Sequence, residues 1–266
     1  MLHNTGKSWI YYDLIGPPEA PVVCMTHSLT SDHGMWAEQV PSLLAVGFQV
    51  LRIDTRGHGG SEATPGDYTI EELSGDVLSV LDALGFHSGV HLIGLSMGGM
   101  MGQVIAADHP GRLASLMACC TASKWMGDTE LMLGRIRAVR ESGTLESIVD
   151  ANMERRYGPG FRDRRPLRWE ALRQTFLGTK LDGYFGCMNA CLTHNVEPRL
   201  SQVAAPTLVL AGSEDPTTPP EDNRLIASKI SGARYAEIAG GYHFPNVEYD
   251  AEFNRIMLDW LDEVRG

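Results

Sequence analysis

The sequence predicts an α/β fold in which helices cover both faces of a mostly parallel sheet. Short apolar runs of strand length recur along the chain, and segments with helical spacing of apolar residues separate several of them. Alternation of this kind is typical of parallel sheets, because each parallel crossover needs a long connecting segment. A chain of 266 residues is also long enough to bury one large core and to carry an insertion.

The predicted strands begin near the N-terminus. Residues 8–14 alternate imperfectly between apolar and polar side chains and end at the turn Gly16-Pro17-Pro18. Most of the later strands are short apolar runs, as expected for strands that are covered on both faces. They are residues 21–26, 48–53, 90–93, 113–119, 207–210 and 234–238.

The helices predicted beside the sheet are marked by caps and by apolar spacing. Thr69 and Glu72 form a capping-box pattern, and apolar residues then keep helical spacing until Gly85. Residues 100–108 form a second helical run. The chain closes with an amphipathic helix, which is marked by Phe253, Ile256, Met257, Trp260 and Leu261.

The alternation of strands and helices breaks between residues 122 and 201. This stretch holds several helical patterns in a row, at 129–140, 145–157, 168–177 and 183–192, without a convincing strand. A helical block between two sheet strands is expected to lie over the carboxyl edge of the sheet, where the sites of α/β proteins lie. We therefore expect an α/β core of residues 1–122 and 201–266 and a helical cap, or lid, of residues 123–200.

Composition and charge exclude several classes of protein. The net charge of −11 argues against a partner that is a nucleic acid. The arginine-rich stretch 155–168 is interrupted by proline, glycine and aromatic residues. We expect it to form a solvated face, with a substrate or partner contact as the alternative. No run approaches the ~18 apolar residues of a membrane span, and no signal core is visible, so we expect no membrane partner. The oligomeric state is not indicated.

The cysteines bear on the compartment. Their odd count of five contains no C-x-x-C pair. Buried free thiols in a reducing compartment are therefore expected, which predicts a cytoplasmic location.

The stretch Gly94-Leu95-Ser96-Met97-Gly98 is the most informative motif of the chain. It follows the predicted strand 90–93 and precedes the helical run that starts at Met100. A serine between two glycines at a strand-to-helix junction is the G-x-S-x-G pattern of a nucleophile elbow, whose strained turn exposes the hydroxyl. Ser96 is therefore the candidate nucleophile of a hydrolase that works through an acyl-serine.

A serine nucleophile needs a histidine to take its proton and a carboxylate to orient that histidine. At such an elbow, the acid and then the histidine follow later in the chain, each on a loop after a strand. Asp215 follows the strand 207–210, with the adjacent Glu214 as a weaker alternative, and the loop after residues 113–119 has no carboxylate. His243, in a glycine-rich loop after the last short strand, is the candidate base.

Two backbone N–H groups should form the oxyanion hole that stabilises the developing negative charge. One belongs to Met97, directly after the candidate nucleophile, and the other to Leu29, in the loop after residues 21–26. His27 and His58 lie in loops at the same sheet edge, and we expect both to have structural roles. A direct action of His27 on substrate stays as the alternative.

The sequence gives no sign of a metal or a cofactor. It contains no H-E-x-x-H pattern, no P-loop and no G-x-G-x-x-G after a strand. Hydrolysis by a serine, a histidine and an aspartate needs neither group, so we expect no cofactor and no metal.

Over nearly its whole length the chain resembles the α/β-hydrolase superfamily, and within it the 3-oxoadipate enol-lactonases. The elbow and the segment 54–59 (Asp-Thr-Arg-Gly-His-Gly) are common to the superfamily, and the narrower likeness rests on segments 27–36, 121–125, 183–187 and 205–212. The resemblance implies an α/β-hydrolase fold with an inserted helical lid, and cleavage of a small-molecule lactone or carboxylic ester. That branch commonly carries asparagine where this chain has His27, which leaves the lactone or ester open.

Two other functions would use the same residues. A C–C bond hydrolase of vinylogous diketones would need the same triad and lid, and product analysis on a dienoate substrate would separate it from a lactonase. A ligand-binding receptor of the same fold would bind in the pocket and hydrolyse slowly or incidentally.

The lid must supply selectivity for the substrate. Trp125, directly after a sheet strand, is the candidate for substrate contact, and Lys124, Arg135 and Arg137 are candidate cations for a free carboxylate. Helical spacing indicates that most of the bulky apolar lid residues pack in the core. They are Trp125, Met126, Met132, Met153, Trp169, Phe176, Tyr184 and Met188.

Overall fold

An eight-stranded sheet forms the centre of the structure, a computed structural model that describes residues 1–265. The strand order is β1-β2-β4-β3-β5-β6-β7-β8, with β2 antiparallel to both neighbours and the other pairs parallel. The predicted α/β fold with a mostly parallel sheet is confirmed. The strands are β1 (Leu2–Asn4), β2 (Trp9–Ile15), β3 (Val22–Thr26), β4 (Gln49–Ile53), β5 (Val90–Leu95), β6 (Leu113–Cys119), β7 (Thr207–Gly212) and β8 (Arg234–Ile238).

The strands differ from the predicted ones mainly at their ends. β5 ends at Leu95 and β7 at Gly212, beyond the predicted ends at 93 and 210, because these last residues still pair with Cys119 and Ile238. β1 was not predicted, since its residues are exposed or only partly buried and carry no apolar pattern.

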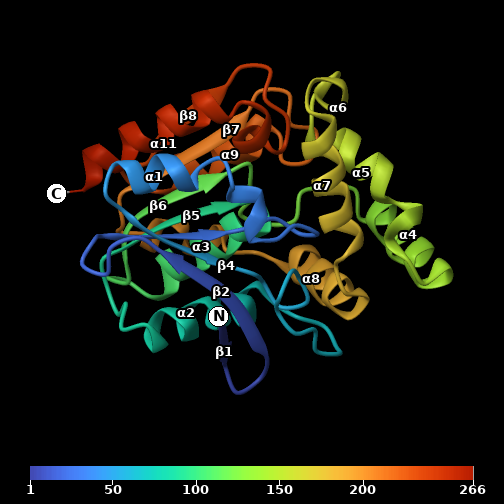
Figure 1. Ribbon diagram of the computed structural model, residues 1–266, viewed down its shortest axis with the longest axis horizontal. Coiled ribbons are helices and arrows are strands. Elements are labelled where there is room, and N and C mark those ends of the chain that lie inside the picture. The colour runs from blue at the N-terminus through green and yellow to red at the C-terminus, as the bar shows by residue number, and fades with distance from the viewer. Residues whose placement is uncertain (266) are drawn as a thin grey trace.

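Helices cover both faces of the sheet (Figure 1). On one face lie α2 (Ile70–Ala83), α3 (Met97–Asp108) and α9 (Pro220–Lys229), and on the other lie α1 (Val40–Ala45) and α11 (Asp250–Val264). The central strand β3 is apolar except for Thr26, because both of its faces are covered. Val22 and Cys24 pack in the core between the sheet and helices α2, α3 and α9, whereas Val23 and Met25 pack in the core between the sheet and helices α1 and α11.

Residues 123–200, here called the cap segment, lie between β6 and β7 in the chain. Figure 1 shows their helices gathered beyond one end of the sheet. The helix predicted at 145–157 is wrong as a single element, because Ile148, with φ −125° and ψ −11°, separates the 3-10 turn η2 from α5. The elements are α4 (Thr129–Ser142), η2 (Leu145–Ser147), α5 (Val149–Arg156), α6 (Phe161–Arg164), α7 (Pro166–Leu177), α8 (Leu181–Thr193) and, across its end, η3 (Glu197–Gln202).

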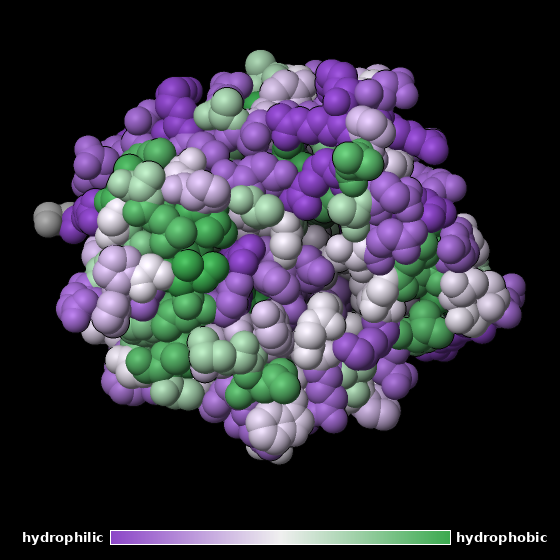
Figure 2. All heavy atoms as spheres, in the orientation of Figure 1, coloured by the Kyte–Doolittle hydropathy of each residue, from purple (hydrophilic) through white to green (hydrophobic). Residues whose placement is uncertain are grey.

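Two short elements complete the fold. They are the 3-10 turn η1 (His33–Trp36) after β3 and α10 (Pro245–Glu248) after β8. All five cysteines are free and buried, as predicted. Within residues 1–265, every helix is too short or too polar to cross a membrane. The face in Figure 2 carries polar residues with apolar patches among them, the largest of which lies on the left of the view.

Candidate active site

Ser96 lies at the junction of β5 and α3, where the backbone turns sharply. Its φ of 56° and ψ of −117° are rare for a residue with a side chain. The flanking glycines permit the turn, because a Cβ on Gly98 would overlap the carbonyl of Thr26 and a Cβ on Gly94 would overlap the carbonyl of Gly98. The sequence G-x-S-x-G thus places Ser96 at the carboxyl edge of the sheet.

Asp215 and His243 come from the loops after β7 and β8. His243 Nδ1 lies 2.8 Å from Asp215 Oδ2, and both side chains are buried. In the tautomer that allows this hydrogen bond, Nδ1 carries the proton and donates to the carboxylate. Nε2 of the neutral ring then holds the lone pair that a general base needs.

Three further donors hold the Asp215 carboxylate. Its Oδ1 accepts hydrogen bonds from the N–H groups of Thr217 and Thr218, at 2.7 and 3.2 Å, and its Oδ2 accepts one of 2.8 Å from the Thr218 hydroxyl. The same hydroxyl lies 3.4 Å from His243 Nδ1. Glu214, the alternative acid, is exposed and makes no hydrogen bond to His243 within the described chain.

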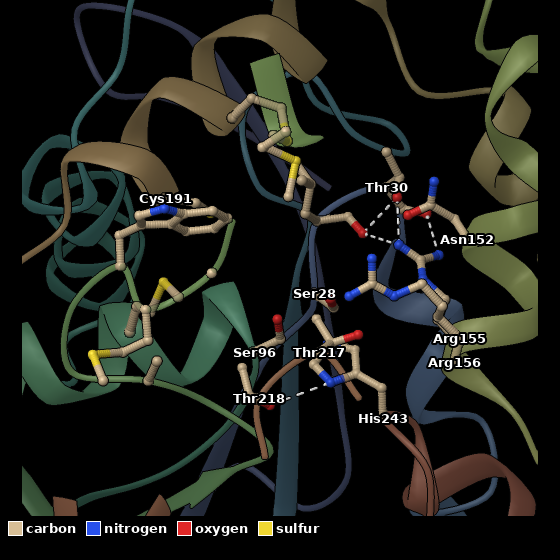
Figure 3. Close-up of a pocket in the computed structure, with 18 of the residues that line it drawn as sticks. Ser28, Thr30, Ser96, Asn152, Arg155, Arg156, Cys191, Thr217, Thr218 and His243 are labelled. Carbon is tan, nitrogen blue, oxygen red and sulfur yellow. Dashed lines mark hydrogen bonds between the residues drawn. The ribbon is translucent and has the colours of Figure 1, made fainter. Parts of the chain in front are cut away.

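Ser96 and His243 line one cavity, which encloses about 110 Å³ between the sheet edge and the cap segment. Figure 3 shows Ser96, Thr218 and His243 close together in this cavity, whereas Arg155 and Arg156 enter it from α5. One water molecule needs roughly 10–15 Å³ of such space, so the cavity has room for a small organic molecule.

The two candidate oxyanion donors also lie at this end of the sheet. The Met97 N–H belongs to the first residue of α3 and so has no acceptor within the helix. Leu29 lines the cavity together with Ser96. Its N–H group has no hydrogen-bond partner in residues 1–265. Both groups are therefore available to a ligand atom.

His27 and His58 hold the loops that surround this site. His27 Nε2 accepts a hydrogen bond of 2.8 Å from the Thr55 N–H, and its Nδ1 donates one of 2.8 Å to the Ser28 carbonyl. His58 Nε2 accepts one of 2.9 Å from the Thr30 N–H. Burial lowers the pKa of both rings, that of His58 to about 3, which keeps them neutral at pH 7. The predicted backbone-holding role of His27 is confirmed, and His58 has a similar one.

Apolar side chains from the cap segment form much of the cavity wall. Trp125, the candidate for substrate contact, is half-buried and lines the cavity. Met153 and Trp169 pack in the core instead. The other bulky cap residues named above line the cavity, namely Met126, Met132, Phe176, Tyr184 and Met188. The predicted core packing is also confirmed for Phe176, Tyr184 and Met188, which are buried in the core and border the cavity, but it is wrong for Met126, which is exposed.

The cations of the cavity differ from the predicted set. Arg135 lines the cavity. The pKa of its guanidinium is lowered, mainly by burial and also by the positive charge of the nearby Arg155. Lys124 also lines the cavity but forms an ion pair of 2.8 Å with Glu197. Arg137 is exposed and lies outside the cavity wall.

The expectation that the whole stretch 155–168 forms a solvated face is wrong at its first two residues. Arg155 and Arg156 line the cavity, and Arg156 is only 8% exposed. A signal for this was present in the sequence. Val149, Met153 and Arg156 follow the spacing of one helix face, and Val149 and Met153 are wholly buried.

Comparison with known proteins shows which family the chain belongs to. The model of the family described as the alpha/beta hydrolase fold matches residues 21–249. 3-Oxoadipate enol-lactonase 2 of Acinetobacter baylyi is 32% identical over 92% of this chain and 90% of its own. RutD of Variovorax paradoxus, named as a proposed carbamate hydrolase, is 27% identical over 96% of this chain and 97% of its own.

A solved structure extends the likeness to three dimensions. The enol-lactonase from Burkholderia xenovorans LB400 matches with a TM-score of 0.94 and 34% identity, over 98% of this chain and 100% of that one. The family match and these relatives cover nearly all of the chain, including the loops that carry Ser96, Asp215 and His243. The chain therefore belongs to the α/β-hydrolase fold family and is related to the enol-lactonases.

Proposed function

We propose that this protein is a serine hydrolase that cleaves a lactone or carboxylic ester through an acyl-serine intermediate. The observation that supports this most is that Ser96 shares one cavity with His243, whose ring is hydrogen-bonded to Asp215. A serine in a strained turn, beside an imidazole that a buried carboxylate orients, has what nucleophilic catalysis requires.

In the proposed acylation, Ser96 Oγ attacks the carbonyl carbon of the substrate while His243 Nε2 takes the hydroxyl proton. Asp215 stabilises the imidazolium that forms. The N–H groups of Leu29 and Met97 donate hydrogen bonds to the oxyanion of the tetrahedral intermediate. When this intermediate collapses, the bond to the leaving oxygen breaks and the imidazolium gives that oxygen its proton.

In the proposed deacylation, a water molecule gives a proton to His243 and attacks the acyl carbon. The second tetrahedral intermediate releases Ser96, which regains its proton from the imidazolium. For a lactone, the leaving oxygen stays attached to the acyl part. The product is then a single hydroxy-acid, or an oxo-acid where the leaving group is an enol.

The charges of the cavity favour a substrate that carries a carboxylate. Arg135 and Arg155 both line it, and neither forms an ion pair with a carboxylate within residues 1–265. The Asp222 carboxylate lines the same cavity without forming an ion pair with either guanidinium. The two guanidinium groups repel each other, and an anionic ligand placed between them would relieve this repulsion. We therefore propose a small lactone or ester with a free carboxylate, held against Trp125.

We also propose a division of labour along the chain. Residues 1–122 and 201–266 would supply the triad and the oxyanion donors, and the cap segment would act as a lid that selects the substrate and limits access of water. Trp125 and Arg135 come from this segment and line the cavity. The five buried free thiols favour a reducing compartment, and we propose a cytoplasmic location.

The test is a screen of purified protein against lactones, short and long acyl esters, and their carboxylate-bearing counterparts. We expect turnover that the Ser96→Ala variant loses by at least about 10⁴-fold without a change in folding. Trapping of the acyl group on Ser96, seen by intact mass spectrometry, would support the covalent step. Equal turnover by wild type and Ser96→Ala would contradict the proposal.

A carbamate is the second candidate substrate, because RutD of Variovorax paradoxus is similar over nearly the whole chain. A carbamate panel in the same screen distinguishes it from a lactone or an ester. Cleavage of a dienoate diketone would instead indicate a C–C hydrolase, and stoichiometric binding without turnover would indicate a receptor.

A further inference from the structure

Arg156 occupies an unusual place for an arginine. It is the last residue of α5 and is only 8% exposed. Its guanidinium carbon lies 4.9 Å from the ring centre of Phe176 and 4.8 Å from that of Phe244. No carboxylate of residues 1–265 forms an ion pair with it. Burial lowers its pKa to about 10, so it stays charged at neutral pH. A buried charge without a counter-ion is costly, which directs attention to what it binds.

The Arg156 side chain binds the loop that carries the candidate oxyanion donor. Its Nη2 donates hydrogen bonds of 2.7 Å to the Leu29 carbonyl and 2.5 Å to the Thr30 hydroxyl, and its Nη1 donates one of 3.4 Å to the Thr30 carbonyl. Figure 3 shows these bonds to Thr30 as dashed lines. The Arg156 side chain therefore joins the cap segment to this loop by three hydrogen bonds.

The peptide group between Leu29 and Thr30 is held from two sides. Its carbonyl accepts from Arg156, and its N–H donates to His58 Nε2 across 2.9 Å. Thr30 has a φ of 53°, a strained conformation that is rare for a threonine. The Leu29 N–H belongs to the preceding peptide group, which is joined to this one through the Leu29 Cα. Fixing the Leu29–Thr30 peptide therefore limits where the Leu29 N–H can point.

The Arg156 backbone holds the loop that carries the base. Its carbonyl accepts a hydrogen bond of 3.0 Å from the N–H of Phe244, the residue directly after His243. The Phe244 ring lies against the Arg156 guanidinium on one side and 5.4 Å, between ring centres, from the His243 ring. One residue of the cap segment thus contacts both loops that the proposed reaction needs.

We infer that Arg156 is a positioning residue. It connects the loop that carries Leu29 and Thr30 to the loop that carries His243, so that the oxyanion hole is in place only when the cap segment is packed on the core. This inference rests on the proposed function. It goes beyond it, because it makes the lid part of the catalytic geometry as well as of substrate selection.

The chemistry of the side chain explains why an arginine stands here. A planar guanidinium can donate in one plane to the oxygens of Leu29 and Thr30 while aromatic rings lie against it. A lysine ammonium is more strongly hydrated and has no such plane. Lysine at this position would keep the charge but hold the loop less well.

The test compares Arg156→Met and Arg156→Lys with wild type on a neutral ester, p-nitrophenyl acetate, and on an anionic one, mono-p-nitrophenyl succinate. We expect the kcat of Arg156→Met to be lower than that of wild type by about 10-fold to 100-fold on both esters. Its KM for the neutral ester should stay within about twofold of the wild-type value. A full oxyanion donor is worth about 10²–10³ in kcat. The kcat of Arg156→Lys should lie between the values of wild type and Arg156→Met.

Two further measurements separate a role of Arg156 in positioning the oxyanion donor from a role in stabilising the fold alone. The inhibition constant of phenylboronic acid, whose serine adduct mimics the tetrahedral oxyanion, should rise in parallel with the loss of kcat. Added millimolar guanidinium should restore part of the activity of Arg156→Ala but leave wild type unchanged. The matched control is Arg168→Met. Arg168 also joins the cap segment to the core, through hydrogen bonds to Glu38 and to the Gly34 carbonyl, but it makes no hydrogen bond to the Leu29–Thr30 loop or to the His243 loop. This variant should keep the wild-type kcat.

The outcomes are distinct. An unchanged kcat on the neutral ester, with a raised KM only on the anionic one, would overturn the inference and make Arg156 a binding group for the substrate carboxylate. If Arg156→Met does not fold, wild-type kcat in the folded Arg156→Lys and an absence of guanidinium rescue would overturn it equally. Ester turnover that survives in Ser96→Ala would show that the proposed function itself fails.

Discussion

His58 Nε2 accepts the backbone N–H of Thr30 across 2.9 Å, so a core histidine holds the loop that carries the Leu29 N–H. Burial, and then the neighbouring His27, lower the pKa of this ring from 6.5 to about 3. Between these values the unfolded chain binds a proton at His58 and the folded protein does not. The free energy of unfolding therefore falls as pH falls from 6.5 toward 3, by up to about 1.4 kcal/mol per pH unit.

The first prediction is that His58→Gln reduces this acid sensitivity. Glutamine offers an oxygen to the Thr30 N–H and cannot be protonated in this range. The melting temperature of the variant, measured from pH 7 to pH 4, should fall less steeply than that of wild type. Some slope should stay, because burial also lowers the pKa of His27 and of His194, the latter to about 4.

The control for this experiment is His87→Gln, which changes an exposed histidine. It should keep the wild-type slope. If wild type and His58→Gln lost stability equally between pH 7 and pH 4, protonation of His58 would not be the cause.

The second prediction concerns Thr218, whose hydroxyl donates to Asp215 Oδ2 at 2.8 Å. Thr218→Val keeps the shape but removes this donor from a buried carboxylate that also orients His243. We expect kcat to fall about tenfold, since a hydrogen bond to a charged group contributes about 1.5–3 kcal/mol and part of it is recovered by rearrangement. Steady-state kinetics on the best ester measures this.

Thr218→Ser is the matched variant, because it keeps the hydroxyl and removes only a methyl group. Its kcat should stay within about threefold of wild type. Equal losses in the serine and valine variants would mean that packing of the methyl group, and not the hydrogen bond, matters at this position.

The third prediction concerns the unpaired guanidinium groups of the cavity. Arg135→Gln and Arg155→Gln should each raise KM for the anionic ester about tenfold, because each removes one of the charges that would face a substrate carboxylate. KM for the neutral ester should change little. Arg137→Gln is the control, since Arg137 lies on α4 together with Arg135 but is exposed and outside the cavity wall. Equal KM changes on both esters would exclude a carboxylate subsite at these residues.

Most strands and the mostly parallel character of the sheet could be predicted, because apolar runs and turns are local signals. The order of the strands in the sheet could not, because it depends on pairing between distant segments. The strain at Ser96 could also be predicted, since only the glycines at 94 and 98 allow the close approach to Gly98 and Thr26. Most helices of the cap could be predicted, but which of their faces line the cavity could not, except in α5, where Val149 and Met153 mark the face that carries Arg156. For the other helices, that depends on how they pack on the core.

The arginines illustrate the limit of a local reading. From the sequence, Arg155 and Arg156 belong to a run of charges, and a run of charges is usually solvated. The ion pairs that Arg164, Arg165 and Arg168 form with Glu248, Asp250 and Glu38 involve partners far away in the chain. Which arginine is paired and which faces the cavity is therefore a tertiary property.

The fourth prediction uses two glycines with opposite surroundings. A Cβ on Gly98 would overlap the Thr26 carbonyl, whereas a Cβ on Gly75, on the exposed face of α2, would meet nothing within 4 Å. Gly75→Ala should raise the free energy of unfolding by about 0.5–1 kcal/mol, because alanine restricts the unfolded chain and favours helix. Gly98→Ala should lower it by about 1–3 kcal/mol through forced displacement of backbone.

Denaturant unfolding of both variants measures these changes, and ester turnover measures the effect on the elbow. Gly75→Ala should keep wild-type kcat, since α2 contributes no residue to the cavity wall. Gly98→Ala should lose at least about tenfold in kcat even under conditions where it is fully folded, because the displaced backbone carries Ser96 and the Met97 N–H. A folded Gly98→Ala with wild-type turnover would show that the elbow tolerates a Cβ, and the close approach to Thr26 would then not constrain the nucleophile.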